Sequence, residues 1–130
     1  MKLIQKAVIK QWNKYLIGLR SEKAKYFPLH WDFPGGKLEP DEEPFSGIER
    51  EVKEETNLDV RALAVIGVYE FDIDRSGPED IHEFTIYSTE ILGWDLALSD
   101  EHLEHRWATK EEIEKLPHEP YFELFFQEHT

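Results

Sequence analysis

Residues 36–58 of the chain are GKLEPDEEPFSGIEREVKEETNL, and this stretch decides the fold. Its second part predicts a helix over residues 44–56. Pro44 suits the first helical position, where its missing N–H costs nothing, and Asn57 can adopt the left-handed conformation that ends a helix. Three apolar side chains recur at helical spacing and should face the core, namely Phe45, Ile48 and Val52.

Three glutamates of this helix stand where carboxylates are unfavourable. At about 100° per residue, Glu51, Glu54 and Glu55 fall within an arc of about 100° beside the apolar stripe. They occupy the last two turns, at the negative end of the helix dipole, where each costs a few tenths of a kcal/mol. Like charges spaced three and four residues apart add a similar penalty, and Arg50 alone cannot neutralise three acids.

A solvated acidic face is one interpretation of these glutamates. The other is a metal site, because hard divalent cations bind carboxylate oxygens and backbone carbonyls. Two unit charges about 4 Å apart interact by roughly 4 kcal/mol at an effective dielectric of 20. A dication would therefore outweigh the local repulsion, and we expect a metal site.

Composition limits the remaining classes of function. The 130 residues suit one domain, residues 1–130, and a hydrophobic content of 40% argues against disorder. The lack of cysteine excludes disulfides and thiolate metal sites. Without a signal-peptide core in residues 1–11 or a long apolar run, we expect a cytoplasmic protein that does not enter a membrane. A net charge of −13 disfavours nucleic-acid polymers as partners, and a small polyanion would need cations between itself and the protein.

Apolar patterning outside this stretch predicts strands and two further helices. Thr109 and Glu112 form a capping box that starts a short helix ending by Pro117. Because strands are accompanied by a few segregated helices, we expect an α+β or α/β sandwich. The expected strands are 3–10 and 14–20 around a turn at 11–13, an extended piece at 30–38 broken by a turn at Pro34-Gly35-Gly36, and 60–71 and 81–92, with a loop at 21–28 and a final helix at 120–128.

The same stretch resembles the Nudix signature, GX5EX7REUXEEXGU, in which U is a bulky aliphatic residue. Asn57 stands in place of the last glycine, a mild departure because Asn tolerates positive φ well. The preceding Trp31–Lys37 is similar to the approach to this box in MutT-like members. The resemblance implies an α/β/α sandwich around a central mixed sheet. The signature positions that match are Gly36, Glu42, Arg50, Glu51, Val52, Glu54, Glu55 and Leu58.

Roles for the matching residues follow from this resemblance. It implies that Glu51, Glu54 and Glu55 bind Mg²⁺, for which Mn²⁺ can substitute, together with the Gly35 carbonyl. One carboxylate, with Glu51 as a candidate, would instead activate water. Arg50 and Glu42 would pair to hold the loop against the helix.

A later loop supplies a further glutamate in some members of the family. Counting back from Trp107 points to Glu101 as a metal ligand or base, with Glu104 as the alternative. Each could equally be an exposed loop acid. His102 and His105 have a ligand-like spacing, but without a third such ligand we predict ordinary loop residues.

Candidate substrate-binding residues lie outside the signature. Arg20, Lys23 and Lys25 could meet phosphate oxygens, with Arg20 the best placed by family position, or they could simply solubilise a strand end. Three aromatics on the later strands, Tyr69, Phe71 and Tyr87, could stack on a base, although strand aromatics are more often core. His118 precedes Glu119-Pro120 where MutT-like enzymes have a base-reading asparagine, which leaves the base open.

The resemblance implies hydrolysis of a phosphoanhydride bond in a nucleoside diphosphate derivative. A MutT-like branch would convert a nucleoside triphosphate to a monophosphate and pyrophosphate. An ADP-ribose or other nucleoside-diphosphate-linked substrate is the main alternative, and a nucleotide-binding module without catalysis is another. A homodimer is compatible with the sequence.

Overall fold

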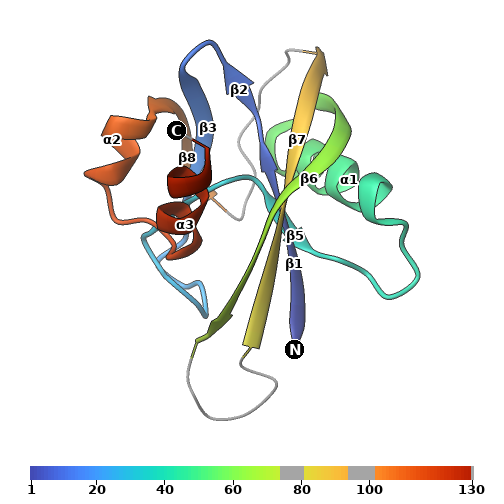
Figure 1. Ribbon diagram of the computed structural model, residues 1–130, viewed down its shortest axis with the longest axis horizontal. Coiled ribbons are helices and arrows are strands. Elements are labelled where there is room, and N and C mark those ends of the chain that lie inside the picture. The colour runs from blue at the N-terminus through green and yellow to red at the C-terminus, as the bar shows by residue number, and fades with distance from the viewer. Residues whose placement is uncertain (74–80, 94–101, 130) are drawn as a thin grey trace.

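The computed structural model describes residues 1–73, 81–93 and 102–129, and in that part of the chain two sheets lie between helices (Figure 1). Helix α1 covers one side, while α2 and α3 lie on the opposite side. The helices span Pro44–Thr56, Lys110–Glu114 and Tyr121–Glu128. The strands are β1 Lys2–Val8, β2 Lys10–Gln11, β3 Lys14–Arg20, β4 Trp31–Asp32, β5 Gly35–Lys37, β6 Asp59–Asp72, β7 Ile81–Gly93 and β8 His102–Thr109.

The strands form two four-stranded sheets rather than one continuous central sheet. The first has the order β5-β1-β7-β6, and in the second β3 pairs with β2, β4 and β8. Strands β1 and β7 are parallel and β1 and β5 antiparallel, so the first sheet is mixed. The expected α+β sandwich with mixed pairing is confirmed, with the sheet divided in two.

Helix α1 has the predicted bounds, and its ends explain them. Glu43 caps the first turn, with its carboxylate accepting hydrogen bonds from the backbone N–H groups of Phe45 and Ser46. Asn57 adopts the left-handed conformation at φ 64°, and its N–H donates to the Lys53 carbonyl. Satisfying these otherwise unpaired backbone groups sets where the helix begins and ends.

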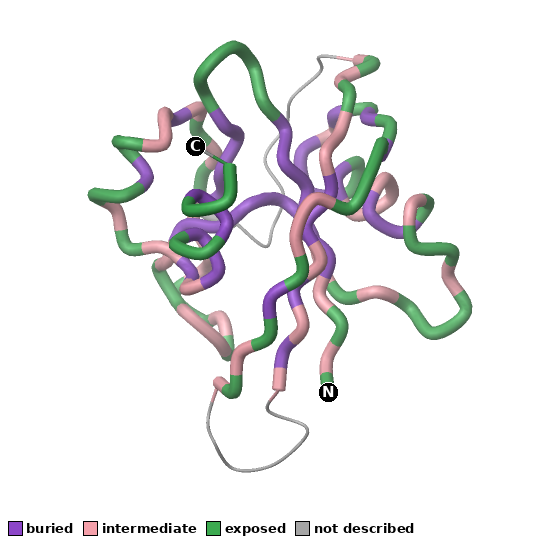
Figure 2. The backbone as a smooth tube through the Cα atoms, in the orientation of Figure 1, coloured by how far each residue is buried: buried purple, intermediate pink, exposed green. Residues whose placement is uncertain are grey.

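Two apolar clusters hold the layers together, and Figure 2 marks the buried residues in purple. The first is rich in aromatic rings and joins α3 to the strands. Phe33 lies within it, and its ring centroid is 4.5 Å from that of Phe122 and 5.5 Å from that of Phe125. The second lies beneath α1, where Ile48 and Val52 are fully buried as predicted. Burial of these side chains is the main favourable contribution to folding.

Two sequence predictions differ from the structure. The turn expected at Pro34-Gly35-Gly36 is partly strand β5, because Gly35 and Gly36 pair with Lys6 and Gln5 of β1. A Cβ at Gly35 would collide with the Gln5 carbonyl, so the glycine is needed for close approach rather than for a turn. The loop expected around His102 and His105 was wrong, since both lie on β8, whose pairing with β3 is a long-range contact.

The capping box at Thr109 and Glu112 is present and starts α2. No helix in the described part of the chain is both long and apolar enough to cross a membrane.

Candidate active site

Arg50 is the centre of an ion-pair cluster on α1. Its Nε and Nη2 donate to the two Glu42 oxygens at 2.6 and 2.9 Å, which is the pairing expected of these two residues. Its Nη2 also reaches Glu51 at 3.0 Å, and its Nη1 reaches Glu54 at 3.1 Å. Paired hydrogen bonds between a guanidinium and a carboxylate are strong and directional. The loop before α1 is therefore fastened to the helix through Arg50.

Glu51 faces the backbone of β5. A Cβ at Gly36 would collide with the Glu51 carboxylate, so the glycine permits this approach. Burial raises the pKa of Glu51, Arg50 opposes that shift, and the neighbouring Glu55 and Glu54 charges raise it further. A carboxylate with these neighbours would gain from an added cation.

Glu55 and Glu54 differ sharply in environment. Glu55 is buried, and its Oε2 accepts a hydrogen bond of 3.0 Å from the Gly35 N–H. The Glu54 side chain is 61% exposed and contacts Arg50. Glu51 and Glu55 therefore face strand β5, whereas Glu54 lies on the exposed side of α1.

These donors suit a hard divalent cation. Two carboxylates lie against a glycine pair whose missing side chains leave room beside Glu51, and every donor is oxygen, as Mg²⁺ prefers. The described side chains form no group of three or more His, Asp or Glu with metal-binding geometry, and Glu51 and Glu54 are both paired with Arg50. Glu51, Glu55 and the Gly35 carbonyl would hold the ion, and Glu54 would join by leaving Arg50.

A cavity of about 430 Å³ adjoins the glycine pair. We call it the cationic cavity, since four of its lining residues are lysine or arginine. Arg20 and Lys23, which the sequence marked as candidates, are among them, whereas Lys25 is not. The lining consists of Ile4, Lys6, Arg20, Ser21, Lys23, Ala24, Gly35, Gly36 and Lys37.

Behind this cavity lies a buried charge network that the sequence did not reveal. Lys6 Nζ donates to Asp32 Oδ2 at 2.8 Å, and Arg20 Nη1 contacts the same oxygen at 3.3 Å. Glu119 Oε2 is 3.8 Å from Lys6 Nζ. The one available signal was a lysine within the apolar alternation of residues 3–9. No local pattern connects this lysine with residues of β4 and of the segment before α3.

Burial raises the pKa of Glu119 to about 8, although Lys6 opposes the shift; the Asp32 charge and a hydrogen bond with the Asp32 carboxyl raise it further. For Lys6, burial lowers the pKa, but the Asp32 and Glu119 charges outweigh this and the net shift is upward. The network therefore holds two cations, one carboxylate and one carboxyl that remains protonated near neutral pH.

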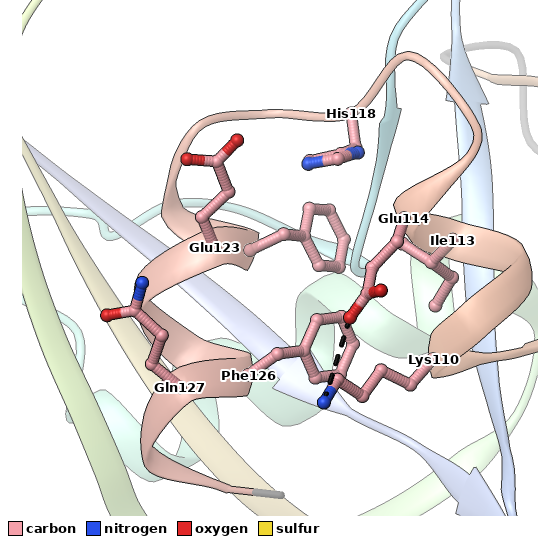
Figure 3. Close-up of a pocket in the computed structure, with 8 residues that line it drawn as sticks. Lys110, Ile113, Glu114, His118, Glu123, Phe126 and Gln127 are labelled. Carbon is pink, nitrogen blue, oxygen red and sulfur yellow. Dashed lines mark ion pairs between the residues drawn. The ribbon is translucent and has the colours of Figure 1, made fainter.

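The sequence also named His118, Tyr87, Glu101 and Glu104 as candidates. His118 lines a second cavity, between α2 and α3, where its Nδ1 is 2.8 Å from the Leu116 carbonyl (Figure 3). Tyr87 is buried, and its hydroxyl accepts a hydrogen bond from Gln5 Nε2. Glu104 is exposed on β8, and Glu101 lies outside the described residues. Substrate contacts of His118 and Tyr87, and the role of Glu101, stay predictions.

The model of the NUDIX domain family matches residues 8–127 of the chain. The MutT protein from Methanosarcina mazei Go1 superposes with a TM-score of 0.84 and 27% identity, covering 99% of this chain and 95% of that one. The human "Diphosphoinositol polyphosphate phosphohydrolase 3-beta" is 35% identical over 56% of this chain, and the match spans only 44% of that protein. The "Bis(5'-nucleosyl)-tetraphosphatase [asymmetrical]" of Caenorhabditis elegans is 28% identical over 72% of this chain and 69% of that protein.

Proposed function

Because its residues 8–127 match the family model, the chain belongs to the NUDIX domain family, and we propose that it hydrolyses a phosphoanhydride bond in a nucleoside diphosphate derivative with Mg²⁺ as cofactor. Within that class we propose a nucleoside triphosphate as substrate and a nucleoside monophosphate and pyrophosphate as products. The observation that carries the proposal is the approach of the Glu51 and Glu55 carboxylates to the glycine pair of β5, beside the cationic cavity.

The chain's own residues supply the main requirements of this reaction. Arg20 and Lys23 line the cavity next to Gly35 and Gly36, where they would hold phosphate oxygens. Glu51 is the candidate to accept the proton of the attacking water as the alternative to binding the ion, since proton transfer needs a carboxylate within hydrogen-bond reach. Water adds to one phosphorus of the anhydride and the bridging P–O bond breaks. The departing group, pyrophosphate or the nucleoside monophosphate according to which phosphorus is attacked, takes the bond electrons. A bound Mg²⁺ would neutralise phosphate charge and lower the pKa of water.

The charge of the molecule agrees with this proposal. A protein with a net charge of −13 repels polyphosphates over most of its surface. The cationic cavity and a divalent ion at Glu51 and Glu55 would together form a local region where a polyanion is attracted. An ADP-ribose-like diphosphate remains the alternative substrate, and a nucleotide-binding module without catalysis the alternative function.

The test is a substrate panel with Mg²⁺, comprising nucleoside triphosphates, ADP-ribose, dinucleoside polyphosphates and nucleotide sugars. We expect triphosphates to be hydrolysed fastest, with pyrophosphate released. Preferential release of AMP and ribose phosphate from ADP-ribose would favour the alternative, and tight nucleotide binding without turnover would favour the binding module.

The variant that tests the site is Glu54→Gln. We expect a loss of activity by orders of magnitude with the fold unchanged, because a carboxylate ligand at the rim of α1 is lost while the exposed position tolerates an amide. Glu111→Gln, an exposed glutamate on α2, is the matched control. Circular dichroism and urea unfolding establish folding, and near wild-type turnover in folded Glu54→Gln protein would contradict the assignment.

A further inference from the structure

The cationic cavity has a charge opposite to that of the molecule. The chain has 28 acidic and 15 basic residues, yet the nine residues lining the cavity include four lysines or arginines and no acid. They come from β1, β3, β5 and the segment after β3, so the enrichment is not a local run of sequence. Converging cations from separate elements create a positive potential in a negative protein.

Lys6 is the most buried of these cations, so its charge loses the most hydration when the protein folds. Its side chain is only 4% exposed, and its Nζ donates one hydrogen bond, to Asp32 at 2.8 Å. Glu119 Oε2, at 3.8 Å, is beyond hydrogen-bond distance. An ammonium group has three N–H donors, so two have no acceptor among the described residues. A buried donor without an acceptor is unfavourable, and a ligand acceptor in the cavity would remove this penalty.

Arg20 repeats this arrangement on β3. Its Nε donates to the Tyr26 carbonyl at 3.0 Å and its Nη1 to Asp32 at 3.3 Å. Its Nη2 has no hydrogen-bond partner among the described residues. Asp32 therefore pairs with both Lys6 and Arg20. Both of these residues line the cavity, and both keep N–H donors that have no acceptor among the described residues. With Glu119 protonated near neutral pH, the network behind the cavity retains a positive charge.

The lining specifies the chemistry of the ligand. Apart from Ser21, the polar side chains lining the cavity are donors without acceptors, and no aromatic ring is present on which a base could stack. A phosphate group offers three acceptor oxygens and negative charge, which suits such a lining. A base edge that mixes donors and acceptors suits it less.

We propose that the cationic cavity binds a phosphate group of the substrate that lies beyond the diphosphate held at Glu51 and Glu55, with Lys6 as its specificity-determining residue. This inference rests on the proposed function and narrows it. The preferred substrates are diphosphates that carry at least one further phosphate, in contrast to diphosphates whose second group is an uncharged sugar.

The test measures anion binding without turnover. Inorganic tripolyphosphate is titrated by calorimetry into the protein in EDTA, so that no divalent ion contributes. We expect binding to wild-type protein and an affinity at least about tenfold weaker in Lys6→Met, with recovery in Lys6→Arg. Lys10→Met removes the same charge from the neighbouring β2 and should change the affinity less than about twofold. If Lys6→Met does not fold, Lys37→Met provides the same test, because Lys37 lies on the exposed rim of the cationic cavity.

Three results would overturn the proposal. The first is no tripolyphosphate binding by the wild-type protein, and the second is equal weakening in Lys6→Met, Lys37→Met and Lys10→Met, which would reflect overall charge alone. The third is a Lys6→Met variant that changes the ratio of ATP to GTP hydrolysis while binding tripolyphosphate normally, since Lys6 would then face a base. Absence of turnover with tripolyphosphate binding intact would instead count against the proposed function and leave the cavity assignment supported.

Discussion

Replacing Glu119 by glutamine should remove much of the pH dependence of folding stability. Glu119 is 3% exposed, and burial raises its pKa from 4.5 to about 8. A folded-state pKa above the unfolded value means that the native state holds its proton more tightly. The resulting stabilisation is fully present below about pH 4.5 and is lost as pH rises through about 8. Glutamine keeps the shape of the protonated carboxyl and does not titrate.

The size of the effect follows from the width of that pH window. Between 4.5 and about 8 the free energy of unfolding falls by up to about 1.4 kcal/mol per pH unit, which sets a ceiling of roughly 5 kcal/mol. This ceiling assumes the full shift, and relaxation of the buried site on ionisation reduces it. We therefore expect about half the ceiling, a change of about 2–3 kcal/mol between the variant and the wild type.

The assay is urea unfolding of both proteins at several pH values between about 5 and about 8.5. Because other titrating groups are common to both proteins, the difference between the two free energies of unfolding isolates Glu119. The wild type should lose stability relative to Glu119→Gln as pH rises. Glu123→Gln, on the exposed face of α3, is the control and should show a constant difference. A constant difference for Glu119→Gln as well, or one of the opposite slope, would refute the reasoning.

Two further predictions concern α1. Asn57→Ala should lower the free energy of unfolding by about 1–2 kcal/mol, because alanine is strained at φ 64°, whereas Asn57→Gly should stay within about 0.5 kcal/mol of wild type; urea midpoints measure both, and equal values for the two variants would contradict this. Arg50→Met should cost about 1–3 kcal/mol at low salt, since Glu42, Glu51 and Glu54 lose their shared partner. That deficit should shrink in about 0.5 M NaCl as the repulsion between the glutamates is screened, and a deficit independent of salt would argue that Arg50 acts through packing alone.

The features of α1 were predictable because they are local. Proline at the first turn, apolar spacing and an asparagine that tolerates positive φ all act within a few residues. Arg50 and Glu42, which pair with each other, are likewise close together in the sequence. The substrate contacts expected of residues farther away in sequence stay predictions; His118, for example, lies on a cavity between α2 and α3.

The α+β class follows from the apolar patterning of the chain, which alternates strands with a few helices. The bounds of α1 and the positions of Glu51, Glu54 and Glu55 along it follow from helical periodicity and from residues within a turn of its ends. Only the tertiary structure decided which carboxylates face β5, that β8 is a strand, and that Lys6, Asp32 and Glu119 meet behind one cavity. Lys6 and Asp32 are 26 residues apart in sequence, and Gly35 and Glu55 are 20 apart. Strand pairing and burial select these contacts over the whole chain, so no short window of sequence contains the information.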